Sequence, residues 1–234
     1  MKAVRISFLH MVAFLRRDMM LFAACISPFF IGPLFRFGIP ALERVMTGYF
    51  VRPAILAPYY EIFDMFFSVL APTMFCYVAA MVVLEERDDH MTKYLEVTPL
   101  GKTGYLVSRL GLPCAAAFGI TGCLLPLFNL SHLQAGMAIY LTLTGALQGL
   151  VITLLVITLS TNKLEGMAVT KLSGIMFLGI MIPYFVPRRI QYILSFLPSF
   201  WVGRAVYQGR SLEMALSIIM SLAWMGVLLK NNTK

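Results

Sequence analysis

The sequence predicts an all-α integral membrane protein with six transmembrane helices. Of its 234 residues, 59% are hydrophobic and only 13% are charged, and the mean hydropathy is +0.82. A soluble domain carries about 25% charged residues. The apolar residues form stretches close to the roughly 20 residues that a helix needs to cross a bilayer. The chain therefore has room for spans joined by short loops, and none for an added nucleotide-binding domain.

Residues 1–18 predict a helix that lies on the membrane surface. Val4, Phe8, Met11 and Leu15 recur at helical spacing and share one face, with basic residues around them. An apolar face edged by lysine and arginine is typical of helices that lie in the membrane interface.

Six apolar stretches predict the spans. They are residues 19–36, 59–84, 105–128, 136–160, 167–186 and 212–229. Residues 37–58 contain three prolines and are expected to form an outer loop. The fifth stretch is short, and it reaches span length only if the side chain of Lys171 extends to the membrane surface.

Residues 187–211 are apolar but interrupted at Pro198 and bounded by arginines. Each half is too short to cross a bilayer. These lengths predict a pair of re-entrant half-helices that dip in from the outer face before the last span, where other parts of the protein must cover their irregular backbone. The alternative is an amphipathic hairpin on the surface.

The distribution of basic residues predicts the orientation. Twelve of the 19 lysine and arginine residues fall on the side that would hold both termini, and seven on the other. Because basic residues accumulate in cytoplasmic loops, both termini are expected in the cytoplasm, with the spans in the plasma membrane. The net charge of +8 then reflects basic residues at the surfaces of the lipid bilayer, and nucleic acid is not an expected partner.

Residues 85–104 form the longest polar insert, and their charges exclude them from hydrocarbon. Read as a helix that ends at Pro99, the insert has an apolar stripe flanked by charges. The stripe consists of Met91, Tyr94, Leu95 and Thr98. The insert is either a solvated connection between two spans or a helix that docks into the groove of a cytoplasmic protein.

Several short motifs in and after this insert follow one another in a characteristic order. They are Glu85-Glu86-Arg87, Lys93-Tyr94-Leu95-Glu96, Val97-Thr98-Pro99-Leu100, and Tyr105 with Arg109. This series resembles the first cytoplasmic loop of type-2 ABC transporter permeases, whose spans and re-entrant pair have the same layout. One departure is Asp88-Asp89-His90, where many members of that family have a glycine-containing turn.

The resemblance implies that the insert couples the chain to a separate ABC ATPase subunit, which carries the ATP and magnesium, and that the permease pairs with a second copy or a related permease. The implied ATPase-binding residues are Glu85, Glu86, Arg87, Met91, Tyr94, Leu95, Thr98, Pro99 and Leu100. The expected function is export of a hydrophobic drug, peptide or lipid-like substrate. The alternative is a non-transporting membrane anchor or sensor that docks a cytoplasmic partner through the same loop.

Patterns of enzyme chemistry are weak in this sequence, so the chain itself is not expected to be an enzyme. No span pairs a serine with a histidine, and no HExxH motif could bind zinc. Residues 118–160 and 172–186 contain no carboxylate that could couple transport to an ion gradient. A membrane enzyme would have to use the acidic cluster at residues 85–89. The four cysteines, in apolar segments, are expected to be small buried side chains with no metal or cofactor.

Two further features leave alternatives open. Glu61 and Asp64 lie one turn apart near the outer end of the second span, where they either meet a cationic substrate or ion or are solvated residues at a helix end. Gly145 and Gly149 form a GxxxG motif, which allows close helix packing either in a dimer or within the subunit.

Overall fold

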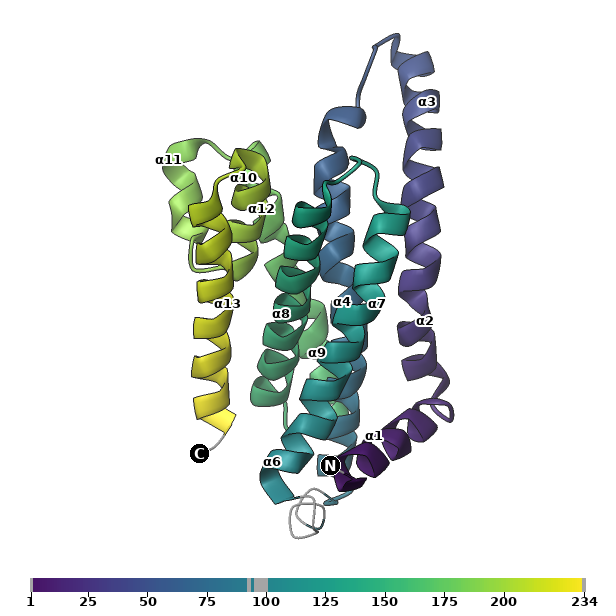
Figure 1. The fold of residues 1–234 in the computed structure, drawn as a ribbon, viewed down its shortest axis with the longest axis vertical. Helices are drawn as coiled ribbons and strands as arrows, with labels where there is room; N and C mark the ends of the chain where they lie inside the picture. The colour runs from purple at the N-terminus through teal and green to yellow at the C-terminus, as the bar shows by residue number, and fades with distance from the viewer. Residues whose placement is uncertain (1, 92–93, 95–100, 233–234) are drawn as a thin grey trace.

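The protein is a bundle of helices, shown in Figure 1. The computed structural model describes residues 2–91, 94 and 101–232. Within these residues, five helical stretches are long and apolar enough to cross a membrane: Met19–Phe50, Ala57–Asp88, Gly104–Phe128, Ala135–Leu159 and Ser211–Lys230. The all-α, multi-pass character of the chain is confirmed, whereas a sixth continuous span is not found in the described part.

Helix α1 (Lys2–Leu15) lies across the base of the bundle, at the end that holds both termini (Figure 1). Asp18 then caps helix α2 (Met19–Pro33). Its carboxylate accepts hydrogen bonds from the backbone N–H groups of Met20, at 2.9 Å, and Leu21, at 3.1 Å. These bonds satisfy two donors that a helix start leaves free, so the chain turns from α1 directly into the first long helix.

The first long helix continues well past residue 36. A π-helical turn, Leu34–Gly38, joins α2 to helix α3 (Ile39–Phe50) without a break. The predicted loop at residues 37–58 was therefore wrong for its first half. Pro40 lies just after this π-helical turn. Such a turn is where a continuous helix accommodates an irregularity in its backbone hydrogen bonds, so the missing N–H of Pro40 does not break the helix.

The turn that was expected there lies farther along the chain. Val51 ends α3 with a φ of 51°. The carboxylate of Glu43 then accepts backbone N–H bonds from Ile55, at 2.9 Å, and Leu56, at 2.6 Å. These bonds hold residues 55–56 against α3 before the next helix begins.

Helices α4 (Tyr60–Asp88) and α8 (Ala135–Leu159) are the buried centre of the bundle. A Cβ atom on Gly145 would lie 1.9 Å from the backbone oxygen of Ser68 on α4, and one on Gly149 would lie 3.1 Å from Cys76 Sγ. The GxxxG motif therefore packs two helices of the same subunit.

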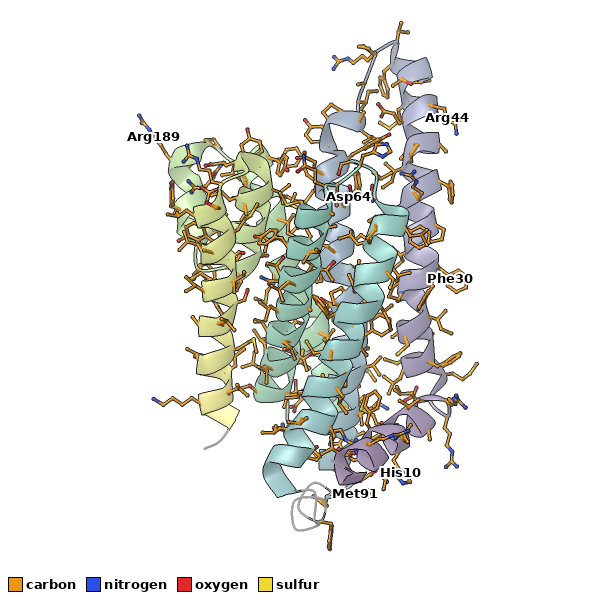
Figure 2. The ribbon with its side chains drawn as sticks, viewed as in Figure 1. His10, Phe30, Arg44, Asp64, Met91 and Arg189 are labelled. Atoms are coloured by element: carbon orange, nitrogen blue, oxygen red, sulfur yellow. The ribbon has the colours of Figure 1, made fainter. Side chains whose placement is uncertain are left out.

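The third long stretch consists of α6 (Gly101–Leu106), a π-helical turn (Val107–Gly111) and α7 (Leu112–Phe128). Asp64 of α4, labelled in Figure 2, fastens the loop that follows. Its carboxylate accepts the backbone N–H groups of Leu130 and Ser131, both at 2.8 Å, and only 2% of the residue is exposed. Asp64 is thus a buried structural acceptor.

The segment after α8 leads from the end with the termini to the opposite end in short helical pieces (Figure 1). These pieces are α9 (Lys163–Ser173), Gly174–Ile180, α10 (Ile182–Phe185), α11 (Arg188–Gln191), Tyr192–Leu194 and α12 (Pro198–Gln208). The expected span at residues 167–186 is thus not one α-helix. Its middle, Gly174–Ile180, is a 3₁₀ helix packed tightly against α12, where a Cβ on Gly179 would lie 2.1 Å from Ser199 Oγ.

Helix α13 (Ser211–Asn232) returns the chain to the end where it began. It packs against α8 and α12. The Tyr140 and Ser217 hydroxyls lie 2.7 Å apart between α8 and α13, and Gln148 Nε2 donates to Ser221 Oγ at 3.3 Å. Polar side chains thus join the last helix to the centre of the bundle.

Candidate functional site

Residues 85–88, called the stem below, are the last turn of α4 and begin the polar insert. The helix ends in paired C-terminal bonds: the N–H of Met91 donates to the oxygen of Glu86, and that of His90 to the oxygen of Arg87. His90 has a φ of 54°, as the Schellman motif requires. The side chain of Met91, which follows this cap, points away from the bundle (Figure 2).

Glu86 joins the stem to the third long stretch and to α1. Its two carboxylate oxygens lie 2.9 and 3.0 Å from Arg109 Nε, and the Tyr105 hydroxyl donates to Oε2 at 2.9 Å. Arg109 Nη1 also donates to the backbone oxygen of Ser7, at 2.9 Å. Because the Arg109 and Glu86 side chains are only 5% and 14% exposed, water screens this pair weakly.

Lys163, at the start of α9, joins the stem to α2. Its ammonium lies 2.7 Å from Glu85 Oε2 and 2.9 Å from Asp18 Oδ2. Its backbone N–H donates to Asp88 Oδ2 at 3.0 Å. One residue therefore contacts two stem carboxylates together with the carboxylate that caps α2.

Arg87 joins the stem to the end of α8. Its Nη1 donates to the backbone oxygen of Ile157 at 2.8 Å, with that of Ser160 at 3.5 Å. A cation is favourable here, because the last carbonyls of a helix have no partner within the helix and carry partial negative charge.

The ion pairs of Lys163 shift the pKa values of both partners. Hydrogen bonding to Lys163 lowers the pKa of Asp18, although partial burial opposes this. Partial burial would lower the pKa of Lys163, but the bonds to Glu85 and Asp18 outweigh it, and the pKa is raised. Both groups are therefore held in their charged forms.

The structure separates the predicted ATPase-binding residues into two groups. Glu85, Glu86 and Arg87 contact other elements of the same chain, whereas Met91 and Tyr94 are 49% and 73% exposed. The remaining predicted residues lie outside the described residues: Leu95, Thr98, Pro99 and Leu100.

Sequence reasoning missed the roles of Asp18 and Lys163, and quoted Arg109 only as part of a motif. A usable signal existed for Arg109, because an arginine inside an apolar span has to find a partner. No such signal distinguished Asp18 or Lys163, because charged residues are common at the ends of spans.

Comparison with known proteins places the chain in a family. No curated protein and no solved structure matches it. A family model described as "Fluoroquinolones export permease protein Rv2686c-like" matches residues 12–230, a range that contains the stem, the insert and the five long apolar stretches. The chain therefore belongs to this family of export permeases, and it is a multi-pass membrane protein of the efflux type.

Proposed function

We propose that the chain is the permease subunit of an ATP-driven type-2 ABC exporter of hydrophobic, drug-like molecules. The description of the family makes fluoroquinolones the first substrates to test. A separate ATPase would bind residues 85–104 on the cytoplasmic side of the plasma membrane, where both termini would also lie.

The observation that carries this proposal is the contrast between the stem and the insert beyond it. The stem contacts α1 and the third long stretch through Arg109, α2 and α9 through Lys163, and α8 through Arg87. Beyond it, Met91 and Tyr94 are exposed. Force applied to the exposed part would reach most of the bundle, as coupling to an ATPase requires.

This arrangement assigns different roles to the predicted residues. Met91 and Tyr94, with Leu95, Thr98, Pro99 and Leu100, would contact the ATPase. Glu85, Glu86 and Arg87 would position the insert, because their side chains already bind elements of the same chain. ATP and magnesium would bind the partner, and this chain would supply no catalytic group.

The proposed transport path runs between two permease copies, or between this chain and a related permease. In each subunit, the segment from α9 to α10 would complete the sixth crossing. The short helices α11 and α12 would form the re-entrant pair at the outer face, because they lie at the end opposite the termini (Figure 1).

The test is purification of the tagged chain from its native membrane in mild detergent, with assay of any bound ATPase. Tyr94→Asp and Leu95→Asp are expected to weaken ATPase binding by about 1–3 kcal/mol, as loss of an interface anchor does. Tyr49→Asp is the matched control, because Tyr49 is 81% exposed but lies on α3, far from the insert.

The expected result is an ATPase that copurifies in a fixed ratio and whose turnover rises with a fluoroquinolone. An ATPase that binds through the insert but whose turnover ignores the permease would favour the anchor or sensor instead. Absence of any ATPase, with export intact, would overturn the proposal.

A further inference from the structure

A carboxylate lies among aromatic rings near the end of the bundle opposite the coupling stem. Glu61 Oε2 accepts a hydrogen bond from the Tyr184 hydroxyl at 3.2 Å. The Tyr184 ring lies edge-on to that of Tyr207, with 4.9 Å between centroids. Beside them, Tyr59 stacks on Phe185 at 5.5 Å. Three parts of the chain thus meet here: residues 59–61, α10 and α12.

The charge of Glu61 has no counterion among the side chains that the structure describes. Its one hydrogen bond comes from Tyr184, and no described lysine or arginine forms an ion pair with it. Arg189, in α11 at the same end, points away from the bundle (Figure 2). Glu61 is also exposed, so its other carboxylate oxygen can reach a ligand.

The other acidic residues of this end differ from Glu61. Glu43 and Asp64 each accept two backbone N–H bonds, and Glu213 is paired with Arg204 at 2.8 Å. The carboxylates of all three are bound within the chain. Glu61 is therefore the described acid at this end whose charge remains available.

The chemistry of this cluster favours an organic cation over a metal ion. Calcium and magnesium need about six oxygen ligands, and the cluster offers one carboxylate and one hydroxyl besides the rings. Aromatic faces attract ammonium groups, and a carboxylate adds direct charge pairing. Tyrosines are common at membrane interfaces, but that preference does not explain a carboxylate among them that has no counterion among the described side chains.

We propose that Glu61, Tyr184 and Tyr207 form a binding site for an organic ammonium group. A role in transport rests on the proposed function and deepens it, since the site would bind the amine of a cargo molecule at the exit end. The same chemistry would bind the ammonium headgroup of a lipid. Binding is measured without an ATPase, so failure of the site and failure of the proposed function are distinguishable.

The first experiment measures binding of benzyltrimethylammonium to the full chain in nanodiscs of phosphatidylglycerol, a lipid without an ammonium headgroup. Glu61→Gln keeps the shape of the site and removes its charge, and is expected to lower affinity about tenfold. Tyr207→Leu is expected to lower affinity about threefold through loss of a ring. Tyr184→Phe keeps the aromatic ring and removes the hydroxyl that donates to the Glu61 carboxylate. The affinity is therefore expected to stay within about threefold of the original.

Glu165→Gln is the matched control, since Glu165 is an exposed carboxylate on α9, and its Oε2 accepts hydrogen bonds from the backbone N–H and the hydroxyl of Thr161. It is expected to leave binding unchanged. Equal affinity in the original chain and Glu61→Gln would overturn the site, as would the same loss in Glu165→Gln.

A second series of nanodiscs identifies the source of the ammonium group. Increasing fractions of phosphatidylcholine are added while the same probe is titrated. If the lipid headgroup occupies the site, probe affinity falls in the original chain but not in Glu61→Gln. If affinity is constant in both, the site selects soluble amines, and efflux of a cationic drug is expected to fall in Glu61→Gln.

Discussion

The guanidinium of Arg109 reaches both carboxylate oxygens of Glu86, with Nε 2.9 Å from one and 3.0 Å from the other. The same group donates to the backbone oxygen of Ser7. Three segments that lie far apart in the sequence therefore meet at one ion pair, in the stem that begins the insert that we propose binds the ATPase.

Arg109→Met is expected to lower the free energy of unfolding by about 3–5 kcal/mol, because it leaves the largely buried Glu86 carboxylate without its counterion. Unfolding in mixed detergent micelles measures this. Arg44→Met is the control: Arg44 is exposed on α3 (Figure 2), and its loss is expected to change stability by no more than about 0.5 kcal/mol. Equal effects of the two substitutions would contradict a structural role for the pair.

Lys163→Met is expected to flatten the dependence of stability on acid pH. The lowered pKa of Asp18 contributes stability above its unfolded pKa of about 3.9, and this is lost as pH falls through the lower native value. Without Lys163, the pKa of Asp18 lies closer to its unfolded value, so the free energy of unfolding falls less as the pH is lowered. The raised pKa of Lys163 acts at the alkaline end, where its contribution disappears as pH rises through the native value.

Melting temperatures from pH 6 to about pH 2, a range that runs below the unfolded pKa of Asp18, measure the acid part of this effect. Lys171→Met serves as the control, because Lys171 is exposed on the same helix and is expected to leave the slope unchanged. A Lys163→Met slope as steep as that of the original chain would exclude the proposed linkage.

Gly145→Ala is expected to destabilise the protein by about 1–3 kcal/mol, as overpacking does. The new Cβ would lie 1.9 Å from the backbone oxygen of Ser68, so two central helices would have to separate. Gly119→Ala on α7 is the comparison, since no atom lies within 4 Å of its Cβ position. That change is expected to be neutral or stabilising by up to about 1 kcal/mol. Similar results for both would show that α4 and α8 do not touch at Gly145.

His90→Gly is expected to stabilise the end of α4 by about 1 kcal/mol, because a residue with a Cβ is strained at its φ of 54°. Gly209→Ala is the converse test at a φ of 65°, and is expected to destabilise by a similar amount. Thermal unfolding of the two variants measures both. A destabilised His90→Gly protein would mean that the imidazole itself holds the stem.

The long apolar stretches allowed the sequence to predict most of the helices, because span length and composition are local properties. The extension through α3 was not predictable in the same way. Gly38 and Pro40 locally favour a turn, and only the π-helical turn shows how they are accommodated. The irregular course of Gly174–Ile180 depends on contact with α12, which no local pattern encodes.

The residues of the candidate site also fall into two groups: those that a local pattern identifies and those whose partners are distant in the sequence. The exposure of Met91 and Tyr94 agrees with the apolar stripe, which is a local pattern. The partners of the stem are distant in sequence: Arg109 lies 23 residues from Glu86, and Ser7 lies 102 residues from Arg109. Those pairings could only come from the three-dimensional arrangement.

The position of Lys163 bears on how the protein is made. A chain is synthesised from its N-terminus, so Asp18 and Glu85 enter the membrane region 145 and 78 residues before their common partner. Until α9 has been synthesised, the ammonium that joins these two carboxylates is absent. The nascent permease can therefore form the contacts of Lys163 with the stem only after α8 is complete. A polypeptide truncated before residue 163 would carry the insert without these contacts.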